Sequence, residues 1–184
     1  MQKSEAIELL HSQMQSQNLR KHCLSVAAVM RSLAKHFGEN EDLWEVAGII
    51  HDADYEKYPE KHPSVLIEEL EKRKEDQKLI AAIKAHAWGY RDGLPKPETK
   101  MEWSLYTCDE LTGLIVACAL VRPDKKLASV DVASVQKKWK QKSFAAGVNR
   151  AQIEMCEKEL GIKLEDFIGI ALKAMQGISS ELGL

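Results

Sequence analysis

The apolar residues of this chain recur at intervals of three and four along most of its length, and this spacing constrains the fold more than any other feature. Residues three and four apart share one face of a helix, so the spacing predicts amphipathic helices. These cover about 4–15, 18–37, 41–50, 64–74, 77–87, 101–121, 149–160 and 164–178. No segment shows the alternation of apolar and polar residues that is typical of a half-buried strand. We therefore expect an all-α, compact bundle of about eight or nine helices.

The length of the chain favours one domain. Its 184 residues, of which 45% are hydrophobic, can bury one proper core but are too few for two domains to be expected. We expect a single helical domain over 1–184, with a core at about 18–121 and C-terminal helices at 129–184 that pack on it. The sequence is compatible with a homodimer.

Charge and hydropathy narrow the classes of partner. The formal net charge of -2 gives no general reason to expect a nucleic acid or an anionic membrane surface. No apolar run approaches the roughly 20 residues that span a bilayer, and residues 1–5 lack the apolar region of a signal peptide. We expect a cytoplasmic protein. The cysteines lie far apart without a C-x-x-C pair, which favours reduced core thiols: Cys23, Cys108, Cys118 and Cys156.

A histidine and an aspartate stand side by side, as His51-Asp52, at the end of the apolar segment 41–50. Neighbouring side chains on a helix point about 100° apart, so both can face one atom only where the helix ends or loosens. The doublet therefore indicates a site at a helix terminus. Neutral imidazole and carboxylate groups are ligands for divalent metals such as Zn, Mn or Fe.

Three further polar residues lie within apolar stripes of other predicted helices: His22, His86 and Asp109. Each of them alone is more often a core residue whose hydrogen bonds are satisfied. Together with the doublet, however, they form a set of inward-facing polar groups that ordinary hydrogen bonds would hardly satisfy, and a buried unpaired carboxylate is costly. A metal centre would give all of them a common partner.

The order His22, His51-Asp52, Asp109 resembles the signature of the HD superfamily of metal-dependent phosphohydrolases, whose fold is all-helical. The resemblance covers roughly residues 18–121. It implies that these four residues bind one metal ion.

Some members of that superfamily, the HDIG and HD-GYP branches, have two additional histidines and hold two metals that the aspartate of the doublet bridges. His62 and His86 resemble those two positions, which implies that Asp52 is the bridge. His62 precedes Pro63 at what looks like a helix start, where a histidine also has an ordinary capping role. The expected cofactor is one or two divalent ions: Fe, Mn, Zn, Ni, Co or Mg.

The sequence departs from the HDIG pattern directly after the doublet. Where that branch has Ile-Gly-Lys, this chain has Ala53-Asp54-Tyr55, so the lysine that binds phosphate there has no counterpart. The GYP motif is absent too. Lys57 lies close enough to replace the lysine, and three other candidates for phosphate binding are Arg91, Lys142 and Arg150. Asp54 is expected to accept a hydrogen bond behind the metal ligands or to carry a proton, and Tyr55 to line the pocket.

Phosphoester hydrolysis is the leading functional hypothesis. Two bridged divalent metals activate water and stabilise an in-line phosphoryl displacement, so Asp52, Asp54 and Lys57 are the candidate catalytic residues. A nucleotide or another small phosphorylated compound is the expected substrate, with no membrane partner and no specific nucleic-acid partner. Three alternatives stay open: a di-iron oxygenase on the same site, a non-catalytic module that binds metal or nucleotide, and a helical interaction protein without metal.

Overall fold

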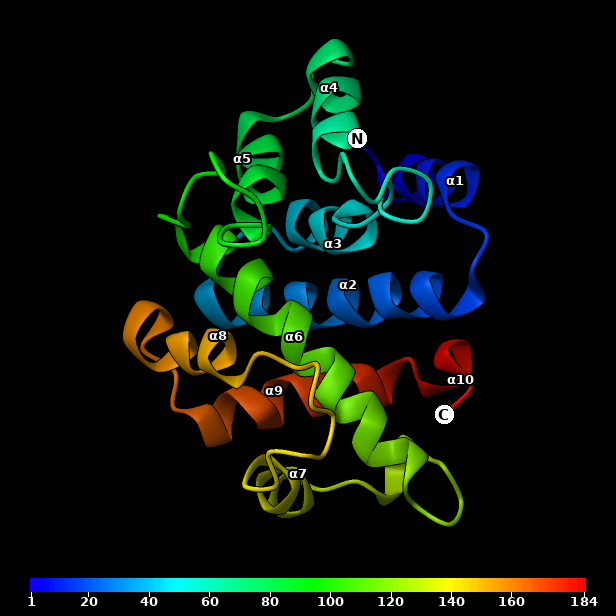
Figure 1. The fold of residues 1–184 in the computed structure, drawn as a ribbon, viewed down its shortest axis with the longest axis vertical. Coiled ribbons are helices and arrows are strands. Elements are labelled where there is room, and N and C mark those ends of the chain that lie inside the picture. Colours follow the sequence, from blue (N-terminus) through cyan, green and yellow to red (C-terminus); the bar gives the residue numbers. More distant parts are fainter.

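The computed structural model describes all 184 residues and confirms the all-α prediction (Figure 1). A 3-10 turn at Leu127–Ser129 precedes α7, and a π-helical turn at Cys156–Leu160 continues α8. The helices are α1 (Lys3–Gln13), α2 (Gln17–Phe37), α3 (Glu41–Ile50), α4 (Ser64–Lys72), α5 (Gln77–His86), α6 (Lys100–Leu120), α7 (Val132–Trp139), α8 (Arg150–Met155), α9 (Leu164–Gly177) and α10 (Ser179–Leu182).

The eight helices expected from the apolar spacing are all present, and the differences have local causes. The helix α7 was not predicted, because it is short and buries only Val135. Pro63 stands just before α4 rather than inside its first turn. The helix predicted over 149–160 widens into the π-helical turn before Gly161 ends it in the left-handed conformation, at φ 70°.

Helix α2 lies at the centre of the molecule, between α3 on one side and α9 on the other (Figure 1). Helix α6 crosses α2 and runs from α5 to the neighbourhood of α7. One cluster of 47 buried apolar residues includes both Ala6 and Leu182, so the C-terminal helices share a core with the N-terminal ones. All four cysteines are buried and free, as expected. No helix combines the length and the apolar character needed to cross a membrane.

The contact between α2 and α3 depends on Gly48. A Cβ atom at this position would lie 2.4 Å from the Cα of Ala27 and 2.6 Å from its backbone nitrogen. Any side chain would therefore push the two helices apart. Because α2 carries His22 and α3 leads into His51, the glycine also sets the distance between these histidines.

We expect Gly48→Ala to lower the free energy of unfolding by about 3 kcal/mol, because the added methyl group meets backbone atoms that cannot rotate away. Urea unfolding followed by circular dichroism measures the change. Gly113→Ala is the matched control: its Cβ would have a nearest neighbour at 3.9 Å, so stability should stay the same or rise by up to about 1 kcal/mol. Equal stability of the Gly48 variant and the native protein would contradict this account of the helix contact.

Candidate metal centre

The doublet lies at a helix terminus, as its sequence predicts. Helix α3 ends at Ile50, and His51 follows as the C-cap residue, whose backbone N–H donates to the carbonyl of Ala47. Residues 51–57 continue in turns. Leaving the helix allows both side chains to face the same place, with His51 Nε2 3.6 Å from Asp52 Oδ2.

A first group of possible metal ligands joins three helices. His22 from α2 places its Nε2 atom 2.9 Å from Oδ1 of Asp109 on α6 and 3.8 Å from Oδ2 of Asp52. His51 Nε2 lies 3.5 Å from the same Asp109 oxygen. Ligand atoms of His22, His51 and Asp52 lie within 4.8 Å of one another, so this group could hold a metal ion, with Asp109 beside it.

A second group lies on the other side of Asp52. Oδ1 of Asp52 is 3.3 Å from Nε2 of His62 and 3.5 Å from Nε2 of His86. His62 comes from the segment before α4, and His86 ends α5. Asp52 thus presents one oxygen to each group, and each group could hold a metal ion.

Hydrogen bonds at Nδ1 determine the tautomers of the histidines. His51 Nδ1 lies 2.9 Å from the carbonyl oxygen of Gly48, and His86 Nδ1 lies 2.6 Å from that of Ile83. A carbonyl oxygen only accepts, so in both rings Nδ1 carries the hydrogen and donates it. His62 Nδ1 donates in the same way to Asp54 Oδ1 at 2.7 Å. In their neutral forms these rings direct a lone pair on Nε2 into the site.

His22 also carries its hydrogen on Nδ1. The hydroxyl of Thr112 donates to the carbonyl of Asp109 at 2.8 Å, so the hydroxyl oxygen is left to accept from His22 Nδ1 at 3.3 Å. The Nε2 atom of His22 then faces a carboxylate oxygen.

Acceptors thus face acceptors throughout the site. The Nε2 atoms of His62 and His86 are only 3.2 Å apart, and the buried Nε2 of His51 has no hydrogen-bond partner. Lone pairs at such distances repel unless a proton or a cation lies among them. Imidazole nitrogens with carboxylates, held through Nδ1 by backbone or carboxylate acceptors, are the donor set of divalent metal sites, so the residues fit such ions.

In the metal-free protein a proton takes this place at His51. Burial opposes a charge on this imidazole, but the carboxylates of Asp52 and Asp109 outweigh burial and raise the pKa of His51 to about 9. Burial also opposes ionisation of the two carboxyl groups, yet the nearby His51 lowers the pKa of each. A metal ion that binds here has to displace the proton on His51.

Asp54 does not face the ions' expected positions. Its buried carboxylate accepts hydrogen bonds from His62 Nδ1 at 2.7 Å and from the backbone N–H of Leu66, in the first turn of α4, at 2.9 Å. It lies on the side of the His62 ring opposite to Asp52. The role that this geometry supports is orientation of His62.

The structure does not bring the four predicted phosphate-binding cations to the site. Lys57 is exposed and lies over the ring of Tyr58, 5.3 Å from its centroid. Arg91 donates to the carbonyl of Pro59 at 2.6 Å. Lys142 is exposed, and Arg150 donates to backbone carbonyls of the segment that precedes it.

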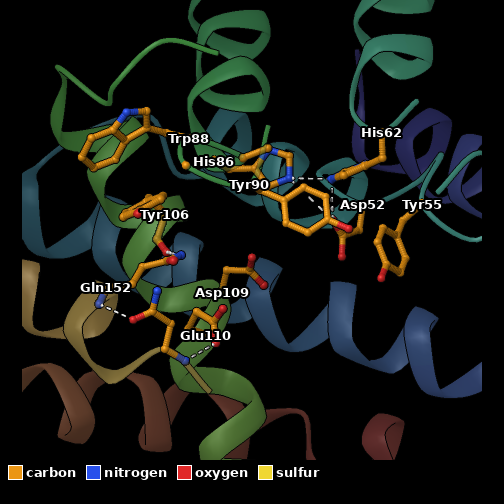
Figure 2. A pocket seen from close by; sticks show the side chains of 13 residues that line it. Asp52, Tyr55, His62, His86, Trp88, Tyr90, Tyr106, Asp109, Glu110 and Gln152 are labelled. Carbon is orange, nitrogen blue, oxygen red and sulfur yellow. Dashed lines mark hydrogen bonds and ion pairs between the residues drawn. The ribbon is translucent and has the colours of Figure 1, made fainter. Parts of the chain in front are cut away.

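A cavity of about 340 Å³ opens beside Asp52 and Asp109 (Figure 2). Tyr55 lines it, as expected, but no lysine or arginine does. Its lining residues are Asp52, Tyr55, His62, His86, Ala87, Trp88, Gly89, Tyr90, Tyr106, Asp109, Glu110, Asn149 and Gln152.

Several of these lining residues were not identified from the sequence. Trp88 and Tyr90 follow His86 closely, and Glu110 follows Asp109, so closeness to a candidate ligand could have indicated them. Asn149 and Gln152 lie outside the predicted core at 18–121. Only the packing of α8 against α6 brings them to the cavity.

We expect Asp54→Asn to weaken metal binding by about 10- to 100-fold, because a neutral amide holds the Nδ1 hydrogen of His62 less firmly than a carboxylate does. Titration with Mn²⁺, followed by calorimetry, measures the affinity of each site. Asp92→Asn, an exposed carboxylate in the loop after α5, is the control and should bind as the native protein does. Unchanged affinity in the Asp54 variant would rule out this supporting role.

We also expect metal affinity to rise with pH. Because the pKa of His51 is raised to about 9, its proton competes with the metal throughout the range below pH 9. One displaced proton predicts a gain in affinity of up to about tenfold per pH unit. Calorimetry at roughly pH 6.5, 7.2 and 8.0 measures the affinity, and repeating it in buffers of different ionisation enthalpy would show the proton release. A metal affinity that does not change with pH would contradict the assignment of His51 as a metal ligand.

Comparison with known proteins agrees with this geometry. The family model for the HD domain matches residues 19–118, a range that contains all six candidate metal ligands: His22, His51, Asp52, His62, His86 and Asp109. Ribonuclease Y from Acholeplasma laidlawii (strain PG-8A) is 31% identical over 119 residues, which are 62% of this chain and 20% of the ribonuclease. The chain therefore spans about a fifth of the length of that relative. Since the family model covers more than half of the sequence, the chain belongs to the HD domain family, within the superfamily of metal-dependent phosphohydrolases.

Proposed function

We propose that this protein is a metal-dependent phosphohydrolase that acts on a small phosphoester. The observation that carries the proposal is the shared carboxylate: Asp52 belongs to both groups of possible ligands and itself lines the cavity. In this proposal His22, His51 and Asp109 would hold one ion, His62 and His86 would hold the other, and Asp52 would be shared between the two groups.

A bound pair of divalent ions would supply Lewis acidity, which generates a nucleophile near neutral pH and neutralises charge on the phosphoryl group. The protein's own contribution is to hold the ligands in position. Each of the four imidazoles is fixed at Nδ1, and Asp54 ties His62 to the start of α4. Such fixed orientation keeps the donor atoms in place while a substrate binds.

The cavity supports a small substrate. Its volume of about 340 Å³ is near the lower end of the range for small-molecule pockets, about 300 to 1,000 Å³. Proteins that bind a nucleic-acid strand neutralise successive phosphates with lysine and arginine, and neither residue lines this cavity. The proposal is therefore a compact phosphoester rather than a polynucleotide, although the relative is named a ribonuclease.

Hydrolysis of a panel of phosphomonoesters and phosphodiesters by protein loaded with Mn²⁺, Fe²⁺ or Zn²⁺ tests the proposal. We expect His51→Ala and Asp52→Ala to lower kcat/KM by at least about 100-fold, because each removes a side chain that would hold a metal ion. His11→Ala, an exposed histidine on α1, is the control and should keep native activity.

Activity in the Asp52 and His51 variants equal to that of the native protein would refute the proposal. Oxygen uptake by iron-loaded protein without release of phosphate would point to the oxygenase instead. Tight nucleotide binding without turnover, with every metal, would point to a regulatory module.

A further inference from the structure

The cavity has a second end, away from the histidines. Figure 2 shows Asp109 in the middle, with His62 and Tyr55 on one side and Tyr106, Glu110 and Gln152 on the other. We call Tyr106, Glu110, Asn149 and Gln152 the distal wall. On the histidine side, the rings of Tyr55 and Tyr90 pack against His62, with centroids 5.4 and 6.3 Å away. A substrate whose phosphate lies at Asp52 therefore has the distal wall available for its organic part.

Two hydrogen bonds assemble the distal wall from separate elements. The backbone N–H of Asn149 donates to Glu110 Oε2 at 2.9 Å, and Gln152 Nε2 donates to the carbonyl of Tyr106 at 2.7 Å. Because a carbonyl can only accept, the second bond determines which way the Gln152 amide is turned. Oε1 of Gln152 and Oε1 of Glu110 are left as acceptors without a protein donor.

The side chain of Asn149 adds a donor. Its Oδ1 accepts from the backbone N–H of Gln152 at 3.2 Å, so the amide nitrogen is free to donate. The distal wall therefore offers two acceptors, one of them a carboxylate, and one donor. The ring of Tyr106, which packs on Trp88 with centroids 5.6 Å apart, supplies an aromatic surface beside them.

Arg150 holds the distal wall in a preformed shape. Its guanidinium donates to the backbone carbonyls of Trp139 at 3.1 Å, Phe144 at 2.6 Å and Gln141 at 3.3 Å. These bonds fold the segment between α7 and α8 around the arginine, next to Asn149. A wall that is ordered before binding can discriminate between ligands without the cost of ordering it.

The two acceptors and the donor of the distal wall are suited to bind the hydroxyl groups of a ligand. A hydroxyl both donates and accepts, so it can donate to Glu110 or Gln152 and accept from Asn149. A sugar also has a face of C–H groups that can pack on the Tyr106 ring. A second phosphate would be repelled, because ionised phosphate oxygens accept but do not donate and would meet the Glu110 carboxylate.

We propose that the distal wall selects phosphomonoesters whose leaving group carries several hydroxyl groups, as a sugar or another polyol does, and that Glu110 and Gln152 bind those hydroxyls. This inference rests on the proposed function and adds a substrate class to it. It assigns Glu110, Asn149 and Gln152 to specificity rather than to metal binding.

The test compares ribose 5-phosphate with pentyl phosphate, which has the same number of carbons and a primary phosphate ester but no hydroxyl groups. We expect metal-loaded native protein to prefer ribose 5-phosphate in kcat/KM by at least about tenfold, the effect of one or two hydrogen bonds. In Glu110→Gln and Gln152→Met this ratio should fall at least about fivefold. In Glu154→Gln, an exposed carboxylate on the same helix as Gln152, it should stay at the native value.

Calorimetric binding of the same two compounds separates this inference from the function on which it rests. Preferential binding of ribose 5-phosphate that the Glu110 and Gln152 variants lose, without any hydrolysis, would support the distal wall and refute the phosphohydrolase. Hydrolysis of both compounds at equal rates, or a preference that neither variant changes, would overturn the distal wall and leave the phosphohydrolase standing.

Discussion

The carboxylate of Asp52 lies between the Nε2 atoms of four histidines, and the construction of the site depends on this contact. Each imidazole is held at Nδ1 by an acceptor, so each directs a lone pair toward the carboxylates. Such a concentration of acceptors is unfavourable in a partly buried place unless positive charge lies within it. The carboxylates raise the pKa of His51 to about 9, which means that they favour a positive charge at this position.

Close packing of the helices brings these acceptors together. Gly48 lets α3 approach the backbone of α2, and α3 ends immediately afterwards, so that His51 and Asp52 turn toward His22. Helix α6 serves both ends of the cavity through consecutive residues. Asp109 lies 2.9 Å from His22, whereas Glu110 accepts from the N–H of Asn149. Neighbouring helix positions point about 100° apart, which is why one helix can supply both a candidate metal ligand and a wall of the cavity.

The family match does not cover the whole cavity. The HD domain match over 19–118 contains every candidate metal ligand, but Asn149 and Gln152 lie beyond it. The relative named ribonuclease Y shares only a fifth of its length with this chain. The part of the cavity that Asn149 and Gln152 build therefore lies outside the segment on which family membership rests.

The sequence by itself determined the helical fold and the candidate ligands, because both depend on local patterns. Apolar spacing identifies helices, and a histidine or aspartate inside an apolar stripe must face the interior, as His22, His86 and Asp109 do. The positions of long charged side chains were decided only by the tertiary structure. Lys57 and Arg150 were plausible phosphate ligands by sequence, yet one packs over Tyr58 and the other binds backbone carbonyls. The distal wall likewise joins residues about 40 positions apart, whose meeting depends on how α8 packs against α6 and on no local pattern.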